Sequence, residues 1–343
     1  MNFSQTIKER RTIRRFSTTP VAPELVGSLI NDAACLYKAE GAPRWRCLIA
    51  NTPESRHRLV DSMMTKMKES RFGKLIPAKM IDFFVKRITD IPAHLIFIAE
   101  SASDQRQSDE NYAAVCSVMQ NFQLLGWDRG LGALWDTDPM FHSEAFLTEI
   151  GLQAGERFAG ILHVGYFDKA PRARRRTPAE QKWTAIGGGG QADGLPSDRV
   201  RISAQSILEV LNDAVWAPND GLREPWRFIH VTGNEAVAKL SDSSGDASSA
   251  FLLIVAKQEA DPHKQEEDYA AVCCLIQNVQ LLVKSRSWYS RRSIPDWIYD
   301  PDQCEPFGIQ SGERIVALLE FGENDRPSDS HSSPPPFLNI THL

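Results

Sequence analysis

Blocks of apolar and polar residues along the chain predict a mixture of helices and strands. Apolar positions recur at helical spacing over residues 23–33 and 112–129, whereas residues 95–99 and 157–166 are short apolar runs typical of buried strands. The same order returns over residues 206–215, 251–256, 269–284 and 314–321. Helices and strands that alternate in this way favour a mixed α/β unit in which helices cover a sheet.

The second half of the chain repeats the first. Glu110–Cys116 returns as Glu267–Cys273, so Tyr112 and Tyr269 correspond at an offset of 157 positions. Upstream, Trp45 returns as Trp226 at an offset of 181. The second copy has therefore lost 24 residues (181 − 157 = 24), which correspond to part of residues 63–91 in the first copy. A repeat that keeps its register over such a length predicts two copies of one structural unit.

These offsets divide the chain into four expected parts. Residues 1–181 form the first repeat, 182–198 a Gly-rich linker, 199–324 a degenerate second repeat, and 325–343 a tail rich in Ser and Pro. The run Gly187–Gly190 suits a flexible linker better than a phosphate-binding loop, because no strand precedes it. The tail cannot form a core alone, so it is either disordered or wraps the other repeat.

Composition narrows the class of protein. The chain has 343 residues and a net charge of −5, and it contains no apolar run near the roughly 20 residues of a membrane span. Its start lacks the apolar core of a signal peptide, which predicts a cytoplasmic protein with no membrane partner. The acidic chain also lacks the broad basic surface of a nucleic-acid binder. Its six cysteines show no metal-ligand spacing, so we expect buried thiols and no metal.

Two basic clusters occur in the first repeat and are absent from the second. They are Arg10–Arg15, which includes Arg11, Thr12 and Arg14, and Arg172–Arg176, which includes Arg174. Arginine forks and a threonine hydroxyl suit a phosphate dianion, although a solvated basic face is the alternative for either cluster alone. The corresponding residues of the second repeat are Gln191, Ala192, Asp193, Leu195, Asp329 and His331. Because the two clusters are lost together, we expect them to share one ligand, a phosphate group.

The second repeat keeps a loop that the first has lost. Pro218, Asn219 and Asp220 lie in a stretch rich in turn-forming residues, where the first repeat has Tyr37, Lys38 and Ala39. The losses in the two repeats are therefore complementary. Trp45, Trp216 and Trp226 either line a cleft near this loop or pack in the core, and core packing is the better interpretation.

The combined motifs resemble the nitroreductase family. They are the basic run from Arg10, the loop from Trp216 to Phe228, the Gly130–Trp135 segment after a helix, the strand entry at Gly155–Arg157, and Pro171–Arg174. The resemblance covers about residues 3–180 and, more weakly, 200–322. It implies an α+β nitroreductase-like fold that normally forms a homodimer with FMN at the interface. This chain would then be a family dimer fused into one polypeptide, an intramolecular pseudo-dimer with a single FMN site.

The resemblance also implies roles for individual residues. The FMN phosphate, ribityl chain and pyrimidine edge would be held by Arg10, Arg11, Thr12, Arg14, Arg172 and Arg174, and Pro218, Asn219 and Asp220 would close over the ring from the other repeat. Trp135, Asp136 and Thr137 align with the stretch whose backbone amide meets flavin N5, although the glycines common there are absent. Arg14 would stabilise the negative charge of the reduced flavin.

The implied activity is ping-pong hydride transfer from NAD(P)H to a conjugated acceptor such as a nitroaromatic or a quinone. No GxGxxG motif follows a predicted strand, so a nicotinamide would bind against the flavin itself. Three alternatives remain: an FMN-dependent dehydrogenase or oxidase acting on a natural-product intermediate, a flavin-sequestering protein with little turnover, and a relative that retains no flavin. The internal pseudo-dimer is compatible with a monomer or a homodimer. The physiological acceptor and the choice between NADH and NADPH are not specified by the sequence.

Overall fold

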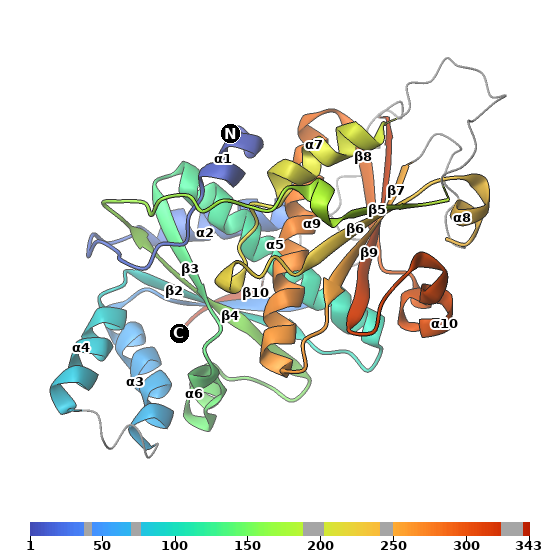
Figure 1. Cartoon of the computed structure of the whole chain (residues 1–343). Coiled ribbons are helices and arrows are strands. Elements are labelled where there is room, and N and C mark those ends of the chain that lie inside the picture. Colours follow the sequence, from blue (N-terminus) through green and yellow to red (C-terminus); the bar gives the residue numbers. More distant parts are fainter. Residues whose placement is uncertain (38–42, 70–76, 188–201, 241–249, 324–338) are drawn as a thin grey trace. The chain divides into compact units, whose positions relative to one another are not determined.

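The computed structural model describes residues 1–37, 43–69, 77–187, 202–240, 250–323 and 339–343. The chain forms two compact units (Figure 1). The first, here the N-terminal unit, consists of residues 10–173 and the C-terminal residues 335–343. The second, here the C-terminal unit, consists of residues 174–334 and the N-terminal residues 1–9. Each unit therefore contains one end of the chain from the opposite repeat.

The N-terminal unit contains a five-stranded sheet in the order β10-β1-β2-β4-β3. Its strands are β1 (Trp45–Ala50), β2 (Ala93–Glu100), β3 (Leu131–Asp136), β4 (Glu156–Tyr166) and β10 (Asn339–His342). Strand β10 pairs parallel with β1, and the other pairs are antiparallel. The helices are α2 (Pro23–Leu36), α3 (Pro53–Glu69), α4 (Ala78–Thr89), α5 (Gln105–Asp128) and α6 (Glu144–Glu149). Helix α5 packs against β2 and β3 and is buried over most of its length.

The C-terminal unit contains a second five-stranded sheet, in the order β5-β6-β7-β9-β8. Its strands are β5 (Trp183–Ile186), β6 (Trp226–Val231), β7 (Ala250–Lys257), β8 (Trp288–Ser293) and β9 (Glu313–Glu323). The helices are α1 (Phe3–Glu9), α7 (Ala204–Ala214), α8 (Asn234–Ala238), α9 (Pro262–Ser285) and α10 (Pro301–Cys304). In the described part of the chain, no helix is long and apolar enough to cross a membrane.

The two sheets have the same register at the offsets found in the sequence. Ala93 of β2 pairs with Val164 of β4, and Ala250 of β7 pairs with Phe321 of β9, each 157 positions later. Both pairs of strands change register at the same place, after Phe97 in one sheet and after Ile254 in the other. The prediction of an α+β fold is confirmed.

Three chain segments lie in positions that differ from the expected division. Residues 183–186, assigned to the linker, form β5, and residues 339–342 of the tail form β10. Each adds a short parallel strand to an otherwise unpaired sheet edge and satisfies backbone groups there. Helix α1, assigned to the first repeat, belongs to the C-terminal unit, where Ser4 Oγ donates to Asp213 Oδ2 at 2.6 Å. The rest of the linker and tail, with Gln191, Ala192, Asp193, Leu195, Asp329 and His331, lies outside the described residues.

The two units also differ in the segment that connects β1 to β2 in one and β6 to β7 in the other. In the N-terminal unit α3 and α4 lie between β1 and β2, and Leu59 and Met63 of α3 pack with Phe146 of α6 in a buried cluster. Between β6 and β7 the described residues contain only α8. The predicted loss of 24 residues therefore corresponds to this helical insertion.

Candidate functional site

The first basic segment lies along an edge strand of the N-terminal unit. Strand β3 is at the edge of the sheet, and Thr12 forms a parallel bridge with Ala133 on it. The Ile13 amide donates to the Ala133 carbonyl at 3.0 Å, and the Ile13 side chain is buried. The apolar side chain at position 13 anchors a segment that otherwise consists of arginines and Thr12. The backbone thus holds Arg10–Arg14 against β3.

The close approach of this segment depends on a glycine. A β-carbon at Gly132 would lie 2.7 Å from the Ile13 β-carbon and 2.8 Å from the Phe167 ring, closer than real contacts allow. The corresponding residue of the second repeat, at the offset of 157, is Tyr289 on β8. A segment like Arg10–Arg14 therefore has room beside β3 and lacks it beside β8.

The arginines of this segment differ in exposure. Arg10 is buried, whereas Arg14 is exposed. Arg11 Nη1 donates to the Arg10 carbonyl at 2.8 Å, and Arg87 Nη2 of α4 donates to the Arg14 carbonyl at 3.2 Å. These contacts fix the backbone of the segment and leave the Arg14 side chain at the surface of the unit.

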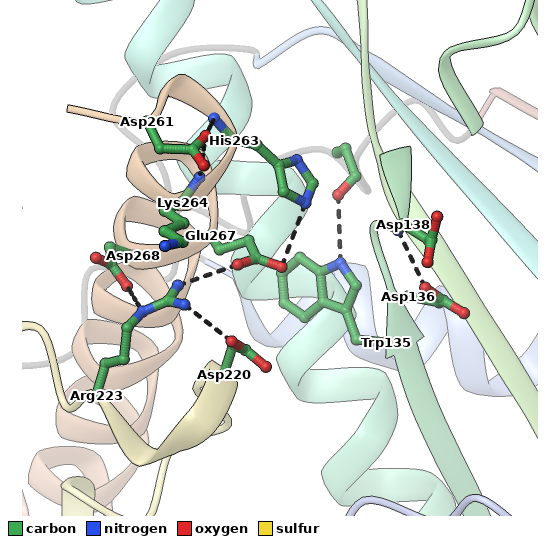
Figure 2. Close-up of polar contacts among 11 residues, drawn as sticks. Trp135, Asp136, Asp138, Asp220, Arg223, Asp261, His263, Lys264, Glu267 and Asp268 are labelled. Carbon is green, nitrogen blue, oxygen red and sulfur yellow. Dashed lines mark hydrogen bonds and ion pairs between the residues drawn. The ribbon is translucent and has the colours of Figure 1, made fainter. Parts of the chain in front are cut away.

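The end of β3 places Trp135 and Asp136 against β4. Trp135 Nε1 donates to the Ala159 carbonyl at 3.3 Å, and Gly160 lies under the indole, with a φ of 136° (Figure 2). The Asp138 amide donates to Asp136 Oδ1 at 3.1 Å, which folds the chain back after β3. Thr137, between them, is half-buried.

The charge of Arg14 in the basic segment affects the pKa of the Asp136 carboxyl. Burial works to raise the pKa of Asp136, but His163, the Asp138 amide and the charge of Arg14 together lower it. Arg14 and Asp136, two of the three residues predicted to be catalytic, lie in the same unit. The second basic cluster is divided: Arg172 is in the N-terminal unit and Arg174 in the C-terminal unit, and both are exposed.

In the C-terminal unit, the loop between α7 and β6 has an unusual backbone. Gly221, Leu222 and Glu224 all have positive φ values, of 56°, 59° and 46°. A left-handed conformation costs a non-glycine residue about 1–3 kcal/mol, so the two side chains at 222 and 224 must be held there by their surroundings. The loop is therefore built to a defined shape.

The side chain of Asn219 contributes to that shape. Its Oδ1 accepts from the Glu224 amide at 3.1 Å, and its Nδ2 donates to the Ala217 carbonyl at 3.3 Å. The predicted cofactor ligand thus also spans its own loop. Asp220, which follows it, is exposed and pairs with Arg223.

Glu224 ties this loop to the segment that follows Arg174. It is 4% exposed, and its two carboxylate oxygens accept from the Thr177 amide at 3.1 and 3.2 Å. Lys182 Nζ donates to the Glu224 carbonyl, and the Arg176 guanidinium lies 5.4 Å from the centre of the Trp216 ring. Within the C-terminal unit, the structure therefore brings the 174–182 segment and the Pro218–Asp220 loop together.

Arg223 fixes the same loop to α9. Its guanidinium donates to Asp268 Oδ1 at 2.9 Å, to Glu267 Oε2 at 3.0 Å and to Asp220 Oδ2 at 2.8 Å (Figure 2). Burial raises the pKa of Asp268, and the hydrogen bond from Arg223 opposes that effect. The three contacts leave the loop anchored at both ends.

Comparison with known proteins decides the family. The sequence model of the nitroreductase family matches residues 7–166. A solved nitroreductase-like family protein from Bacillus cereus is 37% identical, and the similarity covers 55% of this chain and 97% of that one, with a TM-score of 0.50. The chain belongs to the nitroreductase family.

Two other proteins to which the chain is similar are also about half its length. The NAD(P)H nitroreductase YfhC assigned in Bacillus subtilis is 27% identical over 180 residues, which are 52% of this chain and 92% of that protein. The FMN- and NADPH-dependent nitroreductase NfnB from a Sphigopyxis strain is 16% identical, over 51% of this chain and 96% of that one, with a TM-score of 0.41.

Sequence reasoning missed several residues that shape the basic segment and the loop between α7 and β6. Gly132, Arg223 and Glu224 were not singled out, although they differ between the repeats: their counterparts are Tyr289, Ala42 and Pro43. The comparison of the two repeats, which identified the basic clusters, also shows these differences. His163 was missed because its contact with Asp136 depends on the register of β3 and β4. Trp226 is 2% exposed, in agreement with the core interpretation of that residue.

Proposed function

We propose that the chain is an FMN-dependent NAD(P)H oxidoreductase with a single FMN site to which both repeats contribute. The proposal rests on the packing of the Arg10–Arg14 segment against β3. Gly132 leaves room for this packing, whereas Tyr289 occupies the corresponding position of the second repeat. Membership of the family supports an oxidoreductase activity. The difference between the two repeats supports one FMN site in place of two.

The donors present in the N-terminal unit suit FMN. Guanidinium groups at Arg10 and Arg11 and the hydroxyl of Thr12 would hold the phosphate and ribityl chain, with Arg172 and Arg174 as further cations. Arg14 would stabilise negative charge on the reduced ring, next to Trp135, Asp136 and Thr137. When bound, FMN accepts a hydride from one substrate and passes it to another.

The second repeat would complete the site with the loop at Pro218, Asn219 and Asp220. The positive φ values and the anchors at Arg223 and Glu224 give this loop the fixed shape that a cofactor contact needs. Relatives half as long as this chain, and two sheets in one register, support the proposal that a two-subunit arrangement is fused here into one polypeptide.

The proposed reaction is ping-pong. NAD(P)H would supply the hydride and leave, and a conjugated acceptor, such as a nitroaromatic or a quinone, would then bind in the same place. No separate nucleotide-binding motif is present in the sequence, which supports one shared cleft.

The deciding experiment counts flavin. The purified chain is heated, the released flavin is identified by chromatography, and its amount is divided by the amount of polypeptide. One FMN per chain is expected, followed by NAD(P)H-dependent reduction of a quinone. Two FMN per chain would contradict the single site, and none after reconstitution would contradict the cofactor assignment. FMN without turnover would favour a flavin-sequestering protein.

A further inference from the structure

Residues 174–182, here called the strap, are held by two side chains of the second repeat. The Glu224 carboxylate accepts from the Thr177 amide with both oxygens, at 3.1 and 3.2 Å. The Arg176 guanidinium lies 5.4 Å from the centre of the Trp216 ring, close enough for a cation–π contact. Positions 176 and 177 of the strap are therefore held from the two ends of the loop between α7 and β6.

The strap is also fixed beyond Thr177. The Ala179 amide donates to Asn212 Oδ1 of α7 at 2.8 Å, and Ala179 is buried. Asn212 Nδ2 donates to Glu180 Oε1 at 2.8 Å. The strap thus cannot slide along the C-terminal unit without the loss of several hydrogen bonds.

Arg174, at the start of the strap, is exposed. Three residues of fully extended chain span at most about 11 Å, so Arg174 can lie no farther than that from the fixed amide of Thr177. The contact of Glu224 with Thr177 therefore confines the backbone of Arg174 to a small region and leaves its side chain exposed to a ligand.

Glu224 holds the strap at a cost to its own conformation. It is 4% exposed and has a φ of 46°, so the burial of a carboxylate and a left-handed backbone both oppose its place. Lys182 Nζ, 3.8 Å from Glu224 Oε2, offsets part of the charge. The loop itself is closed by another bond, from the Glu224 amide to Asn219 Oδ1. The buried carboxylate therefore serves the strap and not the closure of the loop.

The first repeat has neither of the two side chains that hold the strap. At the offset of 181, Trp216 and Glu224 correspond to Cys35 and Pro43. A cysteine offers no aromatic face and a proline offers no carboxylate. The strap contacts therefore occur in the repeat that keeps the Pro218–Asp220 loop.

We propose that Glu224 is a positioning residue that fixes Arg174 for the flavin phosphate, and that it thereby makes the site prefer FMN to riboflavin. This inference rests on the proposed function, in which Arg174 binds the phosphate and the Pro218–Asp220 loop contacts the flavin ring. Because Glu224 joins the strap to this loop, it would set the spacing between the two ends of the cofactor.

Preorganisation is the physical reason for the preference. A guanidinium whose backbone is already fixed loses less conformational freedom when it binds a phosphate, so more of the interaction appears as affinity. Riboflavin has the ring and the ribityl chain of FMN but no phosphate. It gains nothing from a fixed Arg174, and only FMN binding should depend on the Glu224 carboxylate.

Titration of the flavin-free chain with FMN and with riboflavin tests the inference. The wild-type chain should bind FMN about 100-fold more tightly than riboflavin. Glu224→Ala removes the carboxylate and keeps the backbone groups that bind Asn219 and Lys182. We expect its FMN affinity to fall about tenfold and its riboflavin affinity to stay within about twofold of the wild-type value. Glu224→Gln keeps an acceptor for the Thr177 amide and should show an intermediate preference.

Glu267→Gln is the matched control, because it disturbs the same loop from α9. Glu267 Oε2 accepts from Arg223 Nη2 at 3.0 Å (Figure 2). A change in the shape of the loop should alter the affinities for FMN and riboflavin by the same factor. A loss confined to FMN in Glu267→Gln would overturn the proposal, since any disturbance of the loop would then produce the effect.

A double-mutant cycle tests whether Glu224 acts through Arg174. Arg174→Ala should weaken FMN binding, and Glu224→Ala added to it should weaken binding no further. Effects of the two changes that multiply would overturn the proposal, because Glu224 would then act on FMN by another route. If Glu224→Ala does not fold, Glu224→Gln takes its place in the cycle.

The outcomes separate this inference from the proposed function. Failure of the wild-type chain to bind FMN would overturn the proposed function and this inference with it. Binding of FMN by the wild-type chain, with the same ratio of FMN to riboflavin affinity in Glu224→Ala, would overturn the role of Glu224 alone.

Discussion

The absence of a side chain at Gly132 allows the basic segment to lie against β3. Gly132 leaves room for Ile13, and a methyl group there would meet both Ile13 and Phe167 below 3 Å. Sequence reasoning concentrated on the arginines, but their placement depends on this uncharged position on β3. In the proposed FMN site, the arginines would attract the phosphate, and the packing of Ile13 against Gly132 would orient the segment that carries them.

Gly132→Ala should therefore weaken FMN retention although it removes no donor. We expect the Arg10–Arg14 segment to shift away from β3, with a loss of about 1–3 kcal/mol of stability from overpacking. Bound FMN per chain and the urea midpoint measure the two effects. Gly27→Ala in α2, where nothing lies within 4 Å of the added carbon, is the control and should leave FMN retention unchanged. Full retention in Gly132→Ala would show that the segment does not depend on this packing.

Asn219 has a structural and a proposed cofactor role, which different substitutions separate. Asn219→Ala removes both hydrogen bonds of the side chain within the loop and should weaken FMN binding, with about 1–2 kcal/mol of lost stability. Asn219→Asp keeps an acceptor for the Glu224 amide, so the loop should keep its shape. Equilibrium titration with FMN measures the affinity. Lys38→Ala, at the matching position of the first repeat, should have no effect, and equal effects at both positions would point to two sites.

At the scale of helices and strands, the sequence predicted what local pattern controls. Helix α5 was expected from residue 112 and begins at Gln105, because its first two turns are polar and Asp104 caps them by accepting from the Arg106 and Gln107 amides. Strands β5 and β10 were missed because their stability comes from a distant sheet edge. A contact between His94 of β2 and His163 of β4 was missed for a related reason, since only cross-strand register reveals it.

Equivalent Arg–Glu ion pairs join two strands in each sheet, and their contribution to stability should depend on pH. The hydrogen bond from Arg46 lowers the pKa of Glu156, and Arg227 pairs with Glu313 in the same way. A lowered carboxyl pKa gives stability that is present above the unfolded value, about 4.5, and is lost as the pH falls below it. Glu156→Gln should thus lower the melting temperature at pH 7, with a difference that shrinks below about pH 4.5.

Glu313→Gln is the matched variant for that measurement. Because Arg227 also donates to the Gly308 carbonyl, as Arg46 does to Gly151, the two ion pairs occupy equivalent positions. We expect a melting-temperature difference of the same sign and pH dependence. A difference that grew with acidification in either variant would contradict the lowered pKa.

At the scale of the whole molecule, each unit is completed by the opposite end of the chain. Residues 1–9 belong to the C-terminal unit and residues 335–343 to the N-terminal unit. A chain that ended before residue 335 would leave the β1 edge of the N-terminal sheet without its parallel strand β10. The N-terminal sheet therefore depends on a segment that follows the second repeat in the sequence.

The connection between the units is also where the second basic cluster lies. Arg172 and Arg174 are exposed and belong to different units, so neither is needed for the packing of its own unit. The double change of Arg172 and Arg174 to Glu should leave the melting temperature near that of the wild type. It should weaken FMN binding by at least about 100-fold, because two charged hydrogen bonds to a phosphate are replaced by repulsion.

Arg175→Glu makes half that change of charge between the same strands and is the control. It should retain most of the FMN, which separates a direct phosphate contact from a general effect of net charge. Binding is measured by titration of the flavin-free chain at two salt concentrations, since a mere field effect would fade at high salt. Wild-type occupancy in the double variant would mean that the phosphate is held by the Arg10–Arg14 segment alone. The paired loss of the two clusters in the second repeat would then need a separate cause for each.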